Sequence, residues 1–286
     1  MNIQWFPGHM AKTRRLIGEN LKLVDLVVEL LDARAPLSSR NPDIESICGT
    51  KPRLLILNKS DLADPAENER WLLYFKQQGK QAMLFDSMHS KSTKQVVEAI
   101  RALLSDQRKR QEERGMVNRA MKLMIVGIPN VGKSSFINRL AGRNAAISGD
   151  RPGVTRGKQW IRLSGGLELL DTPGVLWPKF EDEQVGLRLA FSGAIKDEIM
   201  DTETLGAKLM EALCQRAPEA LMARYKLETT EFENGFLALE AVAKKRGFIV
   251  SKGEYDLLRA AQIVLDEFRS AKIGRITLES PKGEEA

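Results

Sequence analysis

The chain has 286 residues, 43% of them hydrophobic, so it is long enough for two domains that each bury a core. Lys and Arg outnumber Asp and Glu by 44 to 38, a net charge of +6 that suits a polyanionic partner without requiring one. Cys48 and Cys214 fit no metal or Cys-x-x-Cys spacing, which excludes a disulfide-rich protein. No signal-peptide pattern opens the sequence, and no run reaches the ~20 apolar residues that span a bilayer. We therefore expect a cytoplasmic protein without a membrane partner.

The first part of the sequence alternates short apolar runs with helical patterns. We expect strands at residues 23–31, 53–57, 82–85 and 123–127. Helices are predicted at residues 10–22, within 65–78, at 93–114 and from about residue 134. Strands that alternate with helices of this length indicate an α/β fold with a mainly parallel sheet. Two more predicted strands, 160–163 and 167–170, flank a Gly-Gly pair that is typical of a hairpin turn.

After Pro178 the strand-like runs give way to helical periodicity. Spacing by threes and fours makes one apolar stripe of Leu257, Leu258, Ala261, Val264, Leu265 and Phe268. Other helices are expected within residues 184–194, 203–215 and 231–246. We therefore predict an α/β domain at residues 1–178 and a small all-α domain at 179–286, with a frayed end from Pro281 onward.

A complete phosphate-binding loop follows the fourth predicted strand, as Gly127-Ile-Pro-Asn-Val-Gly132-Lys133-Ser134. Glycines let the backbone wrap a phosphate, so that N–H groups and the N-terminus of the following helix face its oxygens. We expect Lys133 to reach the β- and γ-phosphates and the Ser134 hydroxyl to ligate Mg²⁺. Since a strand precedes this loop and a helix follows it, a chance glycine-rich turn is a poor alternative.

Two later segments supply candidates for the rest of the metal site. The segment Leu169-Leu-Asp171-Thr-Pro-Gly174 ends a predicted strand with a carboxylate that can hold Mg²⁺ through water and a glycine N–H that can face a γ-phosphate. Thr155, in the loop Pro152-Gly-Val-Thr155, is expected to complete the Mg²⁺ coordination when a triphosphate is bound. Either segment alone would be an ordinary turn.

The stretch Leu54-Leu-Ile-Leu-Asn58-Lys59-Ser60-Asp61 places polar residues directly after a strand. The Asp61 carboxylate can accept hydrogen bonds from guanine N1–H and from the exocyclic amine, whereas adenine lacks this donor pair. Hydrogen bonds to charged groups contribute ~1.5–3 kcal/mol, and sites built on them reject a wrong partner by roughly 10⁴-fold. Beside a complete phosphate loop, Asn58 and Asp61 therefore predict GTP rather than ATP as the ligand. In isolation the stretch would be an Asx-rich turn.

These segments resemble the G-motifs of the translation-factor-related GTPases, in the circularly permuted order G4–G5–G1–G2–G3. The segments are Asn58 to Asp61, Gly127 to Ser134, Thr155, and Asp171 to Gly174. Within that class, Trp5-Phe-Pro-Gly-His-Met-Ala-Lys12 and Asp32-Ala-Arg-Ala-Pro36 resemble the ribosome biogenesis GTPase A family, also called the YlqF family. The resemblance covers nearly the whole chain and is most specific before residue 180.

The resemblance implies GTP and GDP as ligands. Its GTP-binding residues are Asn58, Lys59, Ser60, Asp61, Asp86, Ser87, Asn130, Val131, Gly132, Lys133, Ser134, Ser135 and Gly174. Its Mg²⁺ ligands are Ser134, Thr155 and Asp171. The fifth motif, which packs under guanine, departs from the family pattern, because Met88 replaces the small residue in Phe85-Asp-Ser-Met-His89. We interpret His89 as a polar surface residue.

Many GTPases follow Asp-x-x-Gly with a glutamine that orients the attacking water, but Val175 stands at this position and cannot hydrogen-bond water. The resemblance points to His9, after the hinge Pro7-Gly8, as the catalytic residue that positions the water. A lone terminal histidine is otherwise usually inert. The resemblance also implies that Asn130 coordinates K⁺ near the β- and γ-phosphates, and a turn-forming asparagine is an equal alternative.

The resemblance implies a GTP-hydrolysing assembly factor for the large (50S) ribosomal subunit, which acts as a nucleotide-controlled switch on a late precursor. Its partners would be rRNA and ribosomal proteins rather than DNA, and we expect a monomer when the protein is free. Because Gly174 leads straight into the helical domain, nucleotide state is expected to reposition that domain. Two alternatives stay open: an RNA-binding placeholder whose nucleotide only tunes affinity, and a GTPase that serves tRNA modification or protein targeting.

Basic clusters recur where rRNA could bind. They are Lys12, Arg14 and Arg15; Arg108, Lys109 and Arg110; and Lys244, Lys245 and Arg246 with Lys252. For any single cluster a solvated helix face is the simpler interpretation. Together with the resemblance, the clusters predict binding that weakens steeply with salt.

Overall fold

The computed structural model describes residues 15, 17–89, 93–115, 119–142, 160–163, 165–170, 182–195, 201–250 and 253–281. Among them, the strands are β1 (Leu26–Asp32), β2 (Arg53–Asn58), β3 (Gln81–Phe85), β4 (Met121–Gly127), β5 (Trp160–Leu163) and β6 (Leu167–Leu170). The helices are α2 (Pro42–Cys48), α3 (Pro65–Gln77), α4 (Lys94–Leu103), α5 (Ser105–Glu113), α6 (Lys133–Ala141), α7 (Glu183–Phe191), α8 (Thr202–Arg216), α9 (Pro218–Tyr225), α10 (Gly235–Arg246) and α11 (Leu257–Arg269).

The six strands form one sheet in the order β3-β2-β1-β4-β6-β5. All neighbours pair in parallel except β5 and β6, which form the predicted antiparallel hairpin. This confirms the α/β fold with a mainly parallel sheet. Asp32 pairs with Asn58, and Asn58 pairs with Phe85, so β1, β2 and β3 end side by side. The loops that follow these strands therefore meet at one edge of the sheet, where parallel sheets bind their ligands.

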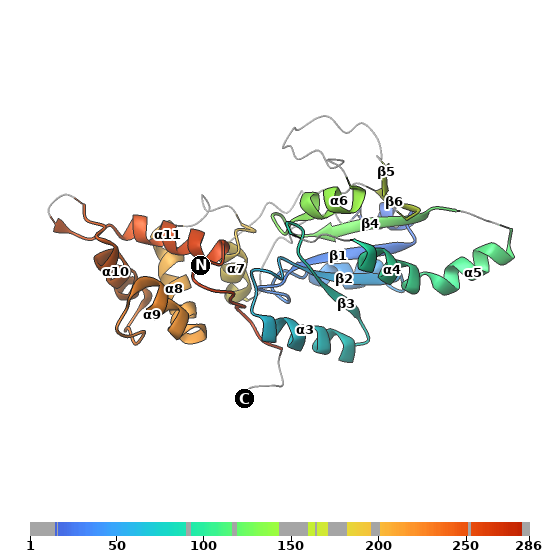
Figure 1. Ribbon diagram of the computed structural model, residues 1–286. Helices are drawn as coiled ribbons and strands as arrows, with labels where there is room; N and C mark the ends of the chain where they lie inside the picture. The colour runs from blue at the N-terminus through green and yellow to red at the C-terminus, as the bar shows by residue number, and fades with distance from the viewer. Residues whose placement is uncertain are drawn as a thin grey trace, which may run out of the picture.

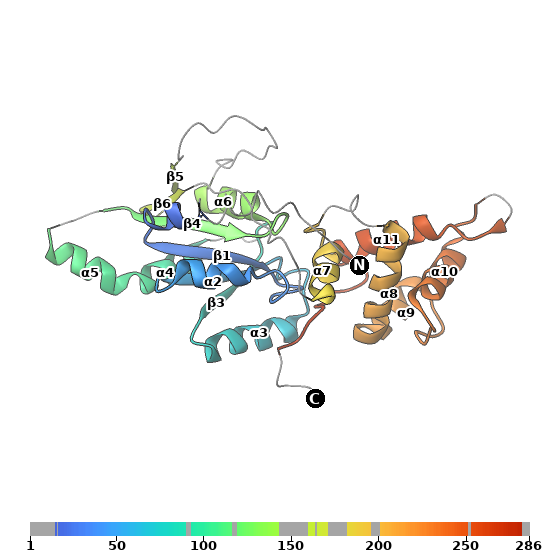
Figure 2. The same cartoon turned by 180° about the vertical axis from the view of Figure 1, so that it is seen from behind.

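Helices cover both faces of the sheet because successive strand residues point to opposite sides. One face packs Leu30, Ile56 and Ile125 against α4 and α6. The other face packs Val27 and Val126 against α2 and against the helical residues 17–21, and packs strand β2 against α3. Figure 1 looks onto the side of α4, and Figure 2 looks onto the side of α2.

The carboxy-terminal helices pack on one another through small residues. A Cβ added to Gly235 of α10 would lie 1.9 Å from the Ala207 carbonyl oxygen of α8, and one added to Gly206 would lie 2.5 Å from Ala261 Cβ of α11. These helices lie beyond the carboxyl ends of the parallel strands, whereas α5 projects from the opposite end (Figure 1). The predicted domain boundary at residue 178 lies outside the described residues.

The structure differs from the predicted elements in four places. The helix expected at residues 93–114 is broken at Leu104, which is buried and separates α4 from α5. Helices α2 and α9 were not predicted. Pro281, expected to fray, is buried, which corrects that prediction for this residue. Within the described part of the chain, no helix is long and apolar enough to cross a membrane.

Candidate functional site

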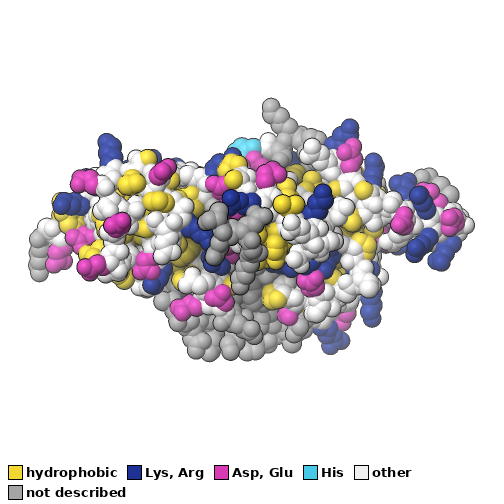
Figure 3. Space-filling view, turned by 90° about the horizontal axis from the view of Figure 1, so that it is seen from below, with side chains coloured by type: hydrophobic (Ala, Val, Ile, Leu, Met, Phe, Trp, Pro, Cys, Tyr) yellow, Lys and Arg dark blue, Asp and Glu magenta, His cyan; other side chains and the backbone are white. Residues whose placement is uncertain are grey.

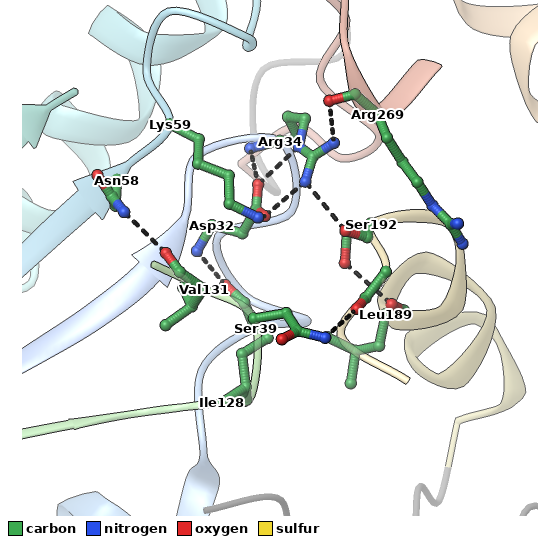
Figure 4. Close-up of polar contacts among 12 residues, drawn as sticks. Asp32, Arg34, Ser39, Asn58, Lys59, Ile128, Val131, Leu189, Ser192 and Arg269 are labelled. Atoms are coloured by element: carbon green, nitrogen blue, oxygen red, sulfur yellow. Dashed lines mark hydrogen bonds and ion pairs between the residues drawn. The ribbon is translucent and has the colours of Figure 1, made fainter. Parts of the chain in front are cut away.

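Asn58 connects the loops that follow β2, β3 and β4. Its Nδ2 donates to the Val131 carbonyl oxygen at 2.7 Å, and its Oδ1 accepts from the Ser87 hydroxyl at 2.7 Å and from the Ser87 N–H at 3.2 Å. Asn58 is 1% exposed, so both ends of its amide are used inside the protein. Figure 4 shows the Asn58 side chain reaching Val131. Asn58 therefore holds the phosphate loop and the predicted base-contact loop together, and Asp61 stays the residue predicted to read the base.

Gly132 allows the phosphate loop to pass close to Asn58. Its φ is +97°, and an added Cβ would lie 2.4 Å from Asn58 Nδ2, so both the backbone conformation and the available space require glycine. Helix α6 begins at the next residue, Lys133, so the N-terminus of this helix directly follows the phosphate loop, as the motif predicts. Asn130, with a φ of +55°, completes the tight turn.

Lys133 lies within the phosphate loop. Its Nζ donates to the carbonyl oxygens of Gly127 at 3.1 Å and Ile128 at 2.6 Å, so the ammonium group is held across the loop. Burial lowers the pKa of Lys133 to about 8, because the charged form loses hydration and, among the described residues, gains no anionic partner. A bound phosphate would supply that partner. The next two residues, Ser134 and Ser135, lie in the first turn of α6, where Ser134 is exposed.

The residues expected to read the base lie around Asp61. The His89 imidazole Nδ1 is 2.9 Å from Asp86 Oδ2 and 3.7 Å from Asp61 Oδ2, and Asp86 Oδ1 accepts from the N–H groups of Met88 and His89. Burial and the nearby Asp86 charge raise the pKa of Asp61. The role of Asp86 stays a prediction. His89 is exposed, which agrees with its interpretation as a polar surface residue, and its imidazole contacts Asp86 beside Asp61.

Lys59 and Ser60 complete this loop through backbone and charge contacts. Lys59 has a φ of +59°, and its Nζ lies 3.1 Å from Asp32 Oδ2. The Ser60 N–H donates to the Phe85 carbonyl oxygen at 3.3 Å, which ties the end of β2 to the end of β3. The loop is therefore fixed from two sides.

Asp32 and Arg34 form a buried ion pair where the sheet meets the carboxy-terminal helices. The Arg34 guanidinium donates to both Asp32 carboxylate oxygens, at 2.9 and 2.8 Å, and to the Ser192 carbonyl oxygen at 3.2 Å (Figure 4). Both side chains are 1% to 2% exposed. Burial alone would raise the pKa of Asp32, but the charges of Arg34 and Lys59 outweigh it and hold this pKa well below its ordinary value. The motif Asp32-Ala-Arg-Ala-Pro36 carries the family resemblance but indicates no role for either side chain.

The phosphate loop also contacts the carboxy-terminal part of the chain. Asn130 Nδ2 donates to the Gly193 carbonyl oxygen, just after α7, at 2.8 Å. This contact fixes the orientation of the Asn130 amide. Asn130 and Arg34 thus bind neighbouring carbonyls, those of Gly193 and Ser192, from two different loops.

Four predicted residues lie outside the described part of the chain: His9, Thr155, Asp171 and Gly174. Of the predicted Mg²⁺ ligands, only Ser134 is described, and its exposed hydroxyl at the start of α6 suits a hard cation beside a phosphate. The roles of all these residues stay predictions.

A phosphate loop after β4 and an Asn-Lys-x-Asp loop after β2, side by side on a parallel sheet, define a P-loop GTP-binding protein whose base-reading motif comes first in the chain. Residues 122–203 match a family model described as 50S ribosome-binding GTPase. The ribosome biogenesis GTPase A of Priestia megaterium is 48% identical over 283 residues, which is 98% of either chain. That of Thermotoga maritima is 32% identical over 280 residues, 98% of this chain and 95% of its own.

Among solved structures, the GNP-bound YlqF from T. maritima matches with a TM-score of 0.65 at 29% identity, over 95% of this chain and 99% of its own. At such identity and coverage, the chain belongs to the ribosome biogenesis GTPase A family. This confirms the family that the motifs predict.

Proposed function

We propose that this protein binds and hydrolyses GTP and acts as an assembly factor for the large ribosomal subunit. The observation that carries the proposal is the Asn58 amide, which joins the phosphate loop to the base-contact loop and thereby builds one guanine nucleotide site. Membership in the ribosome biogenesis GTPase A family supports the large subunit as the target, and the matching family model is described as 50S ribosome-binding. The switch would act on a late precursor of that subunit in the cytoplasm.

In the proposed mechanism, Asp61 accepts the two guanine donors and Lys133 neutralises the β- and γ-phosphates. Mg²⁺, held by Ser134 with Thr155 and Asp171, would supply positive charge to the phosphate oxygens. His9 would orient a water toward the γ-phosphorus. The water oxygen bonds to that phosphorus as the bond to the bridging oxygen breaks with its electron pair on GDP, and the water proton passes to phosphate or solvent. Support for His9 is the motif resemblance together with Val175, which cannot orient water.

Asn130 supports a proposed K⁺ site beside the phosphates. Its Nδ2 is bonded to Gly193, which leaves Oδ1 turned to other partners. A cation there would stabilise charge that develops during hydrolysis. Turnover in KCl and NaCl at equal ionic strength tests this, and equal rates would remove the idea.

Helix α5 supports an rRNA contact. The helix has no buried residue and carries Arg108, Lys109 and Arg110 away from the nucleotide loops. Lys and Arg side chains, with acidic ones among them, gather at this projecting end (Figure 3, right). Since phosphate contacts release counterions, affinity for the subunit should fall steeply with salt. An affinity for the subunit that stays the same between low and high salt would argue against RNA as the main contact.

GTP hydrolysis in the presence and absence of isolated ribosomal subunits tests the proposed function. We expect strong stimulation by large subunits and none by small subunits, because the partner is the large subunit. Equal rates in all three conditions would contradict the proposal. His9→Ala separates the switch from a placeholder: if hydrolysis on ribosomes is lost while subunit assembly proceeds normally, the placeholder interpretation is correct.

A further inference from the structure

The chain returns to the nucleotide site after its last helix. Residues 273–281, called the strap here, leave α11 and run along the sheet domain toward α3, as the dark red segment of Figure 1 shows. Its buried residues are Ile273, Ile276, Thr277, Leu278, Glu279 and Pro281. A segment with this many buried side chains is a fixed part of the fold.

Two strap side chains bind the backbone of the base-reading loop. Arg275 Nη2 donates to the Ser60 carbonyl oxygen and Nε to the Ala63 carbonyl oxygen, both at 2.9 Å. The Thr277 hydroxyl accepts from the Asp64 N–H at 3.0 Å. Asp61 lies between these fixed points, so the strap sets the path of the backbone that carries its carboxylate.

The strap is itself firmly attached. The Leu278 N–H donates to the Arg34 carbonyl oxygen at 2.7 Å, and Trp71 Nε1 donates to the Glu279 carbonyl oxygen at 3.2 Å. The Glu279 carboxylate accepts from the Ser38 hydroxyl at 2.7 Å and from Arg188 at 3.2 Å. Ile273 is buried before Arg275, and Leu278 and Glu279 are bonded after it, so the backbone that carries the exposed Arg275 is held on both sides.

The charges around Asp61 give Arg275 a second effect. Burial and Asp86 disfavour the ionised form of Asp61, and they raise its pKa, while His89 and Arg275 act in the opposite direction. Guanine recognition needs the ionised form, because a carboxylate accepts from two donors at once. Arg275 is thus a positive charge that favours the form of Asp61 that reads guanine.

We infer that Arg275 and Thr277 are positioning residues of the guanine pocket, supplied by the strap rather than by the G-motifs. They hold the loop from Ser60 to Asp64 so that Asp61 faces the base, and they tie the carboxy-terminal end of the chain to nucleotide selectivity. This inference rests on the proposed function, since it requires that guanine nucleotides bind at this site.

The affinities of the full-length protein for GDP and for inosine diphosphate, which lacks the exocyclic amine, test the inference. For Arg275→Ala we expect GDP to bind about tenfold more weakly, and the preference for GDP over inosine diphosphate to fall about threefold. Thr277→Val, which keeps the shape, should weaken GDP binding about threefold. Arg275→Lys should lie between wild type and Arg275→Ala, because it keeps the charge but not the paired donors.

Arg216→Ala is the matched control. Arg216 donates to the Ser280 hydroxyl at 2.9 Å, and Ser280 lies near the far end of the strap from Arg275. The variant should therefore bind both nucleotides as the wild-type protein does. Unchanged GDP binding by Arg275→Ala and Thr277→Val would overturn the inference. An equal loss for both nucleotides would also overturn it, because it would reflect general loosening. The proposed function fails separately if the wild-type protein does not bind GDP.

Discussion

The carboxyl edge of the sheet and the carboxy-terminal helices are built on different principles. At the sheet edge, Asp32, Arg34 and Asn58 are buried polar side chains, and Arg34 and Asn58 bond to backbone carbonyls of distant segments. Between α8, α10 and α11, glycine and alanine bring helices into close contact around an apolar interior. Burying a charge is unfavourable unless it is paired, so polar groups inside a protein mark places where geometry must be specified. Here they mark the nucleotide loops and the junction with the helices.

The largest effect is expected from Arg34→Ala. Removing the guanidinium leaves the buried Asp32 carboxylate with the Lys59 ammonium and the backbone N–H of residue 34, and losing one partner of a buried ion pair costs about 3 kcal/mol or more. Urea unfolding should show this loss. Arg15→Ala, which breaks an exposed pair with Glu19, should change stability by less than about 0.5 kcal/mol. If the two variants were equally stable, the junction would not depend on the buried pair.

A smaller effect is expected where the helices touch. Gly235→Ala places a Cβ 1.9 Å from the Ala207 carbonyl oxygen, so α8 and α10 must shift, at about 1–3 kcal/mol. Glu240→Ala, on the exposed side of α10, is the control and should be nearly neutral. Urea unfolding measures both variants, and GDP affinity should change little because this contact lies away from the loops. A large loss of GDP affinity in Gly235→Ala would show that packing of the carboxy-terminal helices also determines nucleotide binding, which would contradict the comparison of the two regions.

The smallest effect concerns pH. Because the pKa of Lys133 is about 8 and phosphate binds its charged form, the free protein must take up a proton to bind nucleotide above that pH. GDP affinity should therefore fall about fourfold from pH 7 to 8.5, before guanine itself titrates. Titrations across this range check the fall, and Lys133→Arg should flatten it, since arginine stays charged. An unchanged wild-type affinity would contradict it.

Much of the fold could be predicted from local patterns. The predicted strands end in recognisable loops, and parallel strands bring such loops to one edge of the sheet, where Asn58 contacts Ser87 and Val131. Helices α2 and α9 were missed although Pro42 and Pro218 stand at their first positions, a usual helix start, because both helices are short. The break at Leu104 reflects burial of that side chain, which periodicity alone does not indicate.

Long-range contacts escaped prediction. Arg275 meets Ser60 across 215 residues, and Arg34 meets Ser192 across 158 residues, and neither pair carries a local signal. His89 differs, because its contact with Asp86 lies within one loop and its approach to Asp61 depends on how that loop turns. The motif residues carry a local signal in the sequence, whereas residues that contact them from distant segments, such as Arg275, carry none.

The most direct test of the account is the affinity of the protein for purified large ribosomal subunits with a non-hydrolysable GTP analogue, with GDP and without nucleotide. The account predicts tight binding with the GTP analogue and much weaker binding in the other two states, because the nucleotide site controls engagement of the subunit. Equal affinity in all three states would contradict it.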